Sequence, residues 1–148
     1  MSKIIIFDFN RTLYNPDMDK LTPNSLSILS TLKDKGFLLY LVSSANDGKD
    51  ARKKLIRELK IEDFFAEIIV SDDKELKDFE SVIGDEVEKE FSYVIGDRVQ
   101  REIAFGNACK LNTIWYKSGK FSNDLPASKQ EEPDFIVENL IDILNLIG

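Results

Sequence analysis

Six short, continuous apolar runs alternate along this chain with segments of helical periodicity, and this pattern constrains the fold most strongly. The runs are Ile4–Phe7, Phe37–Val42, Ile68–Val70, Tyr93–Ile95, Thr113–Tyr116 and Phe135–Val137. They lack the polar–apolar alternation of a half-exposed strand, so we interpret them as strands buried on both faces. Strands that alternate with helices are joined by right-handed crossovers into a parallel sheet. The predicted fold class is therefore α/β: a three-layer, Rossmann-like parallel sheet with helices on both faces.

The segments between these runs carry apolar stripes at helical spacing. Thr22 and Pro23 form an N-cap and N1 pair for the first helix, which we expect to end before Gly36. We expect a fourth helix from about Val99 to Cys109, and a polar surface loop over residues 117–133. The apolar stripe of the first helix is Leu26, Ile28, Leu29 and Leu32. The stripes of the second, third and last helices are Ala51, Leu55, Ile56 and Leu59; Phe79, Val82 and Ile83; and Leu140, Ile141, Leu144 and Ile147.

Length and composition narrow the class of protein. The 148 residues suit one compact domain with a full core. The net charge of −7 and pI near 4.7 argue against a nucleic-acid surface, because phosphate-backbone binding depends on clustered Lys and Arg. The chain has no histidine and one cysteine, Cys109, which excludes Ser-His or Cys-His nucleophiles, His-ligated zinc and an internal disulfide. Ile4–Phe7 is too short for a signal or membrane segment, so we expect a cytoplasmic protein with no membrane partner.

Polar residues follow four of the predicted strands at the point where each strand ends. They are Asp8, then Ser43-Ser44, then Ser71-Asp72-Asp73 with Lys74, and Gly96-Asp97-Arg98. In parallel sheets ligands bind beyond the carboxyl ends of the strands, so these groups should meet at one edge. A carboxylate can attack phosphorus, carboxylates can hold Mg²⁺, and a lysine with a hydroxyl can hold phosphate oxygens. Together they indicate phosphoryl transfer.

Each of these residues also has an ordinary structural interpretation. An aspartate after a buried strand commonly caps a helix or forms a turn, and serines begin turns routinely. Lys74 lies in "SDDKELKD", where a solvated charge is the usual outcome, and Gly96-Asp97 alone is a common turn dipeptide. The functional hypothesis therefore depends on their joint occurrence, in order, at strand ends.

Four stretches resemble the motifs of the haloacid dehalogenase (HAD) superfamily. "FDFNRTL" is similar to its first motif, Asp-x-Asp-x-Thr after an apolar strand, and "LVSS" to its second, an apolar strand that ends in Ser or Thr. A lysine before a helix matches the third, and "VIGDRVQREI" resembles the fourth, Gly-Asp with a further acid. "NACKLNTIWY" resembles the helix–strand unit that follows. The resemblance covers nearly the whole chain and implies a HAD-like fold.

The resemblance also implies roles for the matching residues. Asp8 would be the catalytic nucleophile that forms an aspartyl-phosphate. The side chains of Asp8 and Asp97, with the backbone carbonyl of Asn10, would bind Mg²⁺ as the cofactor. Ser43 would hydrogen-bond the phosphate, and Lys74 would balance its charge, with Lys77 as the alternative lysine.

Further positions complete the implied site. Thr12 would brace the nucleophile loop, and Glu102 would orient either the metal-bound waters or the lysine. Phe9, Ser44 and Arg98 are the expected substrate-binding residues, with Ser44 or Arg98 at the mouth of the pocket.

Asn10 departs from the family pattern. The family's phosphatases have an acid at this position, which protonates the leaving oxygen and then activates water. An amide cannot carry that proton at neutral pH, and general acid–base help is typically worth about 10²–10⁴-fold in rate. We therefore expect Mg²⁺ and phosphate binding with slow turnover. The alternative is a catalytically impaired HAD-like domain that binds phosphate or a partner. A phospho-receiver domain fits less well, because receivers phosphorylate an Asp on a later strand.

The spacing between motifs implies a capless member of the superfamily. One helix fills most of the segment between Asp8 and Ser43, and one helix and one strand fill the segment between Ser43 and Lys74. We therefore expect a single domain over residues 1–148 with an open site. The expected partner is a phosphorylated small molecule or protein, with no nucleic acid, and a homo-oligomer is possible.

Overall fold

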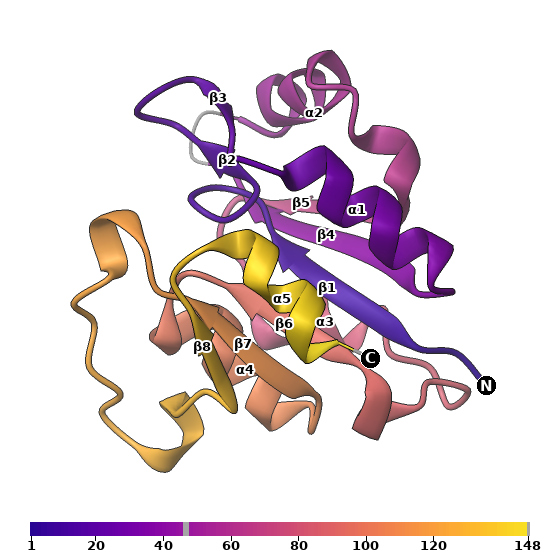
Figure 1. Cartoon of the computed structure of the whole chain (residues 1–148), viewed down its shortest axis with the longest axis vertical. Helices are drawn as coiled ribbons and strands as arrows, with labels where there is room; N and C mark the ends of the chain where they lie inside the picture. Colours follow the sequence, from indigo (N-terminus) through magenta and orange to yellow (C-terminus); the bar gives the residue numbers. More distant parts are fainter. Residues whose placement is uncertain (46–47, 148) are drawn as a thin grey trace.

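The computed structural model describes residues 1–45 and 48–147, and these build one six-stranded sheet (Figure 1). The strand order is β5-β4-β1-β6-β7-β8, and every pairing is parallel. The predicted α/β fold class is confirmed. The strands are β1 (Ile4–Asp8), β4 (Leu38–Ser44), β5 (Phe65–Ser71), β6 (Tyr93–Gly96), β7 (Asn112–Tyr116) and β8 (Phe135–Val137).

Helices cover both faces of this sheet, as Figure 1 shows. One face packs against α1 (Ser25–Asp34), α2 (Lys49–Glu58) and α5 (Ile143–Leu146), and the other against α3 (Leu76–Glu80) and α4 (Ala104–Ala108). On α1 the stripe Ile28, Leu29 and Leu32 is fully buried. Each such side chain stabilises the fold by roughly 2 kcal/mol relative to exposure, so packing on the sheet holds this short helix in place.

Strand β1 lies in the middle of the sheet, between β4 and β6. All five of its residues are buried, and its last residue, Asp8, pairs in register with Val42 of β4. Side chains alternate along a strand. Ile4 and Ile6 point to the face covered by α3 and α4, whereas Phe7 points to the other face. Asp8 therefore leaves the sheet on the α3–α4 side.

The structure differs from the sequence prediction at several boundaries. The first helix begins at Ser25, and the Thr22 carbonyl accepts a hydrogen bond from the Ser25 backbone N–H, so Thr22 belongs to a preceding turn and is not the N-cap. The third helix ends at Glu80, and the last begins with a 3₁₀ turn. A small hairpin, formed by β2 (Tyr14–Asn15) and β3 (Lys20–Leu21), was not predicted. Two-residue strands are too short to produce a pattern.

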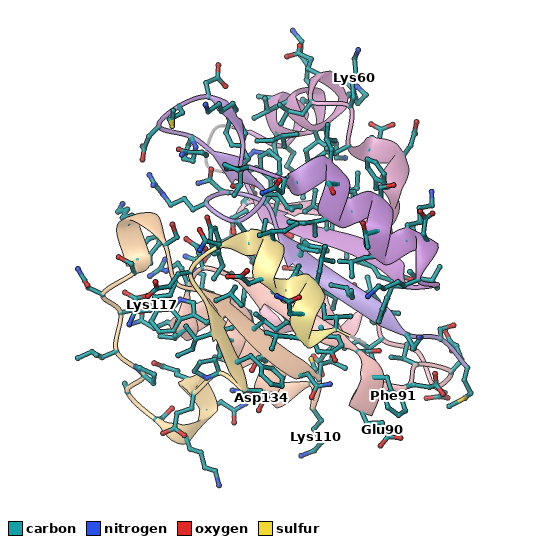
Figure 2. The ribbon with its side chains drawn as sticks, viewed as in Figure 1. Lys60, Glu90, Phe91, Lys110, Lys117 and Asp134 are labelled. Atoms are coloured by element: carbon teal, nitrogen blue, oxygen red, sulfur yellow. The ribbon has the colours of Figure 1, made fainter. Side chains whose placement is uncertain are left out.

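The segment predicted as the fourth helix is helical, but it begins with a π-helix, Val99–Ile103, which continues into α4. Lys60 follows α2 and Lys110 follows α4, with left-handed φ angles of 61° and 62°, and both side chains point outward (Figure 2). The left-handed residue ends each helix and directs the chain back to the sheet. No helix in the described ranges is long and apolar enough to cross a membrane.

Candidate active site

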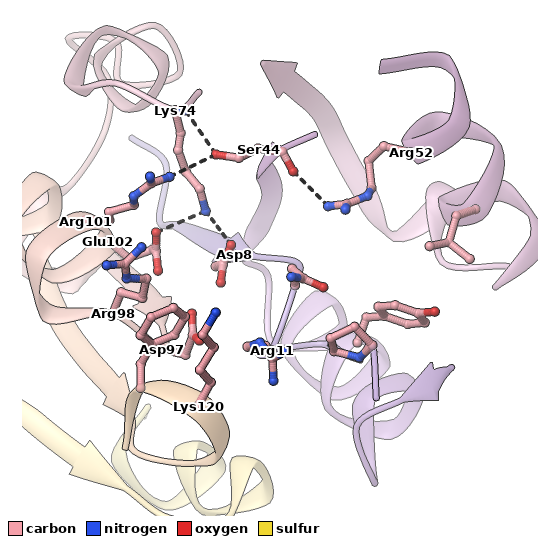
Figure 3. A pocket seen from close by; sticks show the side chains of 15 residues that line it. Asp8, Arg11, Ser44, Arg52, Lys74, Asp97, Arg98, Arg101, Glu102 and Lys120 are labelled. Atoms are coloured by element: carbon pink, nitrogen blue, oxygen red, sulfur yellow. Dashed lines mark hydrogen bonds and ion pairs between the residues drawn. The ribbon is translucent and has the colours of Figure 1, made fainter. Parts of the chain in front are cut away.

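Asp8 is held by hydrogen bonds to both of its carboxylate oxygens, and Figure 3 shows the one from Lys74. Beyond β1 the chain turns back, with the backbone N–H groups of Thr12 and Leu13 donating to the Phe9 carbonyl at 3.2 and 3.0 Å. This turn brings the Thr12 hydroxyl to 3.1 Å from Asp8 Oδ2, to which it donates. Lys74 Nζ donates to Asp8 Oδ1. A carboxylate fixed in this way keeps one orientation at the edge of the sheet.

Lys74 links two acids in the interior. Its ammonium group lies 3.0 Å from Glu102 Oε2 in addition to its contact with Asp8, and its backbone N–H donates to Ser44 Oγ at 3.0 Å. Burial alone lowers the pKa of Lys74, but the charges of Asp8 and Glu102 outweigh burial and raise that pKa above its ordinary value of 10.5. Lys77 is 78% exposed and pairs with Glu75. Of the two candidate lysines, only Lys74 therefore reaches the site.

Glu102 approaches the sheet from the π-helix that follows β6. A Cβ atom on Gly96 would lie 2.3 Å from Glu102 Cγ, so only glycine at this strand end leaves room for the glutamate. Next to it, the Trp115 indole N–H donates to the Asp97 carbonyl at 2.9 Å and fixes the backbone of that residue. The π-helix and the glycine together place Glu102 beside Asp97 and Lys74. Such π-turns are frequent at functional sites.

The acids form a buried cluster with too little positive charge to balance them. Oxygen atoms of Asp8, Asp97 and Glu102 lie within 4.8 Å of one another, and the three side chains are at most 5% exposed. Burial, followed by the charges of Asp8 and Glu102, raises the pKa of Asp97 to about 10. Among the described residues, Asp97 Oδ2 has no hydrogen-bond partner. Hard oxygen donors with excess negative charge and an unpartnered buried oxygen fit a divalent cation such as Mg²⁺.

The two serines at the end of β4 face opposite sides of the sheet. Ser43 is buried on the side of α2, where its hydroxyl accepts a hydrogen bond from Arg52 Nη1 at 2.6 Å, and it does not line the cavity at the strand ends. Ser44 does line that cavity, and its hydroxyl lies 3.3 Å from Arg101 Nη1. The prediction that Ser43 presents its hydroxyl to phosphate is thus corrected: Ser44 has the required position.

Of the other predicted site residues, some line the cavity and one does not. Asn10 and Arg98 line the cavity, as expected of them. Phe9 does not, since its side chain is fully buried and stacks on Tyr14 with ring centroids 5.0 Å apart. Phe9 was predicted to bind substrate, and its side chain cannot do so from this buried position. The physical reason is alternation: Phe9 points into the core on the face opposite to Asp8.

The cavity has a volume of about 540 Å³ and is lined by several residues that the sequence analysis missed. Arg101 follows Arg98 by three residues in "GDRVQREI", a spacing that places both on one side of a helical turn and could have identified it. Arg11 follows Asn10 directly in the loop after β1. Lys120 and Phe121 come from a 3₁₀ turn, Gly119–Phe121, inside the predicted surface loop. That loop is therefore part of the cavity wall.

A family model described as HAD-hydrolase-like matches residues 63–143, more than half of the chain. The chain belongs to the HAD-hydrolase-like family. The match spans Lys74, Asp97 and Glu102, which are three of the four charged residues in the buried cluster. Asp8, the fourth, precedes the matched segment. No curated protein sequence matches the chain significantly.

Solved structures share the fold of this HAD-hydrolase-like chain at low sequence identity. A protein from Clostridium difficile, described as a candidate phosphatase, aligns with a TM-score of 0.79 at 17% identity over 99% of both chains. An uncharacterised protein from Listeria monocytogenes serotype 4b aligns with a TM-score of 0.75 at 20% identity over 98% of both chains. YfnB from Bacillus subtilis, described as a candidate HAD-hydrolase bound to magnesium, gives a TM-score of 0.71 at 21% identity. That alignment covers 86% of this chain and 56% of YfnB.

Proposed function

We propose that this HAD-hydrolase-like chain is a Mg²⁺-dependent phosphohydrolase that cleaves phosphomonoesters through an aspartyl-phosphate at Asp8. The observation that carries the proposal is the contact of one buried ammonium group, Lys74, with Asp8 and Glu102, beside Asp97 at the carboxyl edge of the sheet. A structural ion pair does not account for a third buried carboxylate, Asp97, whose Oδ2 has no hydrogen-bond partner among the described residues, whereas a bound metal ion would.

The residues can be assigned to two chemical steps. In the first, an Asp8 oxygen forms a bond to phosphorus while the ester oxygen leaves with the electron pair of the broken P–O bond. In the second, water attacks the same phosphorus, inorganic phosphate is released and the Asp8 carboxylate is restored. Lys74 and the Ser44 hydroxyl would hold phosphate oxygens, and Glu102 would keep Lys74 in place. Mg²⁺, bound by Asp8, Asp97 and the Asn10 carbonyl, would supply neutralisation of phosphate charge.

Asn10 makes turnover slow in this scheme. Its amide can hydrogen-bond the leaving oxygen, but it cannot protonate that oxygen or remove a proton from water. Both steps then lose general acid–base catalysis, which typically raises the rate about 10²–10⁴-fold. The same residue favours a second candidate function, a HAD-like domain that binds phosphate or a partner without useful turnover.

We also propose that the domain works without a cap. In support of this, the chain between β1 and α1 forms only the β2–β3 hairpin, and α2 is the one α-helix between β4 and β5 in the described residues. An open site must exclude water in another way, and a bound substrate or a partner subunit would do so. A phosphorylated small molecule or protein remains the proposed partner.

Hydrolysis of nitrophenyl phosphate with Mg²⁺ tests the proposal in three proteins: wild type, Asp8→Asn and Asn10→Asp. Slow activity in the wild type that disappears in Asp8→Asn and rises in Asn10→Asp supports the phosphohydrolase. A silent wild type with an active Asn10→Asp supports the binding domain instead. Silence in all three, together with no Mg²⁺ binding by calorimetry, shows that the site is assigned wrongly.

A further inference from the structure

The cavity at the strand ends contains more positive charge than a single phosphate group requires. Of the described lining residues, three are acids, Asp8, Asp97 and Glu102, and six are basic. The basic residues are Arg11, Arg52, Lys74, Arg98, Arg101 and Lys120. This excess of positive charge occurs in a chain whose net charge is −7. A cleft in which one sign of charge predominates attracts ligands of the opposite sign.

Most of these basic groups already have partners in the protein. Lys74 contacts two acids of the cluster, Arg101 lies 3.0 Å from Asp73, and Arg11 lies 3.1 Å from Asp17. Arg52 donates to the Ser43 hydroxyl and to the Ser44 carbonyl. These contacts balance or position the four side chains without a ligand.

Arg98 and Lys120 differ from those four. Within the described part of the chain neither of them forms an ion pair, and Arg98 Nε is buried without a hydrogen-bond partner. Both cations instead contact the ring of Phe121, at 4.1 Å for the Arg98 guanidinium and 5.4 Å for the Lys120 ammonium. In Figure 3 both side chains lie on the side of the cavity away from Arg52. An aromatic ring orients a cation but leaves its hydrogen-bond donors available.

We propose that the substrate is a phosphomonoester with a second anionic group, a phosphate or a carboxylate, and that Arg98 and Lys120 bind this second group. This inference rests on the proposed function, because the first phosphate must bind at Asp8, next to the ammonium group of Lys74. Arg98 directly follows Asp97, so the second anion would bind next to the acidic cluster, and about 540 Å³ accommodates a small bifunctional molecule. A guanidinium and an ammonium group together can bind either a carboxylate or a phosphate through several charge-assisted hydrogen bonds.

Two matched pairs of compounds test the inference on the whole 148-residue chain with Mg²⁺. Comparing fructose 1,6-bisphosphate with fructose 6-phosphate tests whether the site binds a second phosphate. Comparing 3-phosphoglycerate with glycerol 3-phosphate tests whether it binds a carboxylate. Calorimetry gives the dissociation constants, and phosphate release is followed in parallel. We expect the bifunctional member of at least one pair to bind about tenfold or more tightly than its partner, because only that member offers a second anion to charge-assisted hydrogen bonds from Arg98 and Lys120. The pair that shows the preference identifies the second group.

Variants separate a specific subsite from general attraction of anions. Lys120→Gln and the double variant Arg98→Gln/Lys120→Gln should weaken binding of the bifunctional member of the preferred pair much more than binding of its single-phosphate partner, and so remove most of the preference. The exposed Lys129 lies outside the cavity, so Lys129→Gln is the matched control and should retain the preference. Equal affinities within both pairs in the wild type overturn the inference. So does a variant that weakens both members of a pair equally.

The two measurements also distinguish this inference from the proposed function. Phosphate release without any binding preference retains the phosphohydrolase and overturns the second-anion subsite. A binding preference that depends on Arg98 and Lys120, without phosphate release from any compound, supports the subsite and contradicts the phosphohydrolase.

Discussion

Replacing Asp97 by asparagine is expected to stabilise the metal-free protein, although the substitution removes a proposed metal ligand. Asp97 is 2% exposed, and its carboxylate oxygens lie within 4.8 Å of those of Asp8 and Glu102. Lys74 is the one cation in contact with these acids among the described residues. At 4.8 Å and an effective dielectric constant of about 20, two negative charges repel each other by about 3 kcal/mol. Asp97 avoids this repulsion only by taking up a proton, whereas asparagine has nearly the same shape and is neutral without one.

The raised pKa of Asp97 gives a similar energy and also predicts the direction in which the free energy of unfolding changes with pH. Burial and the neighbouring acids raise this pKa from 3.8 to about 10. Between these values the folded state holds a proton that the unfolded state lacks, so the free energy of unfolding falls as pH rises, by about 1.4 kcal/mol per pH unit. At pH 7 the accumulated loss is about 4 kcal/mol. The asparagine side chain of the variant does not titrate, so the advantage of the variant should grow from pH 5 to pH 8.

Urea unfolding at both pH values, with and without Mg²⁺, measures the effect. Without Mg²⁺ at pH 7 we expect Asp97→Asn to be more stable than the wild type by roughly 3 kcal/mol. Added Mg²⁺ should stabilise the wild type, by about 2.7 kcal/mol at one hundred times its dissociation constant, and should stabilise the variant much less. The exposed acid Asp85 gives the control Asp85→Asn, with an expected change below about 0.5 kcal/mol. A destabilised Asp97→Asn, or a variant with the wild-type response to Mg²⁺, would refute the reasoning.

Three further substitutions test other parts of the site by urea unfolding. Lys74→Met leaves the buried acids without their counter-charge and should lower the free energy of unfolding by about 3–5 kcal/mol. The control Lys77→Met, at an exposed position, should change it by less than about 0.5 kcal/mol, and similar effects of the two substitutions would contradict the assignment of the lysine. Gly96→Ala places a methyl group 2.3 Å from Glu102 Cγ and should cost about 1–3 kcal/mol, so a neutral effect would show that Glu102 is free to move. Arg11 has a left-handed φ of 64°, so Arg11→Gly should stabilise the fold by up to about 1 kcal/mol, and a loss of stability would mean that the Arg11–Asp17 pair outweighs the strain.

The sequence was sufficient to predict the sheet and most of the charged cluster. A strand that is buried on both faces has a continuous apolar run in the sequence. A parallel sheet brings the carboxyl ends of its strands to one edge, whatever the details of packing. Asp8, Lys74 and Asp97 each lie at or just beyond such an end, so their convergence followed from topology alone. The choice between Lys74 and Lys77 required the structure. There α3 begins at Leu76, so Lys74 precedes the helix and reaches the site, whereas Lys77 lies on the helix and is exposed.

The remaining errors have a common physical cause. A strand with apolar residues on both faces does not reveal which face each side chain takes, and a shift of one residue reverses the outcome. Ser43 and Ser44 were exchanged for this reason, and Phe9 was assigned to substrate binding although its side chain lies in the core. The positions of Lys120 and Phe121 depend on how a polar loop folds back on the sheet, which no periodic pattern encodes.

The most direct test of the proposed chemistry is detection of the phosphorylated aspartate itself. Wild type and Asp8→Asn are mixed with acetyl phosphate and Mg²⁺, quenched in acid and measured as intact proteins by mass spectrometry, followed by peptide mapping. Because Asn10 cannot activate the hydrolytic water, we predict that wild type accumulates one phosphoryl group on Asp8 and that Asp8→Asn accumulates none. A wild type that carries no phosphoryl group and releases no phosphate, or an Asp8→Asn variant that is phosphorylated to the same extent, would contradict the assignment of Asp8 as the nucleophile.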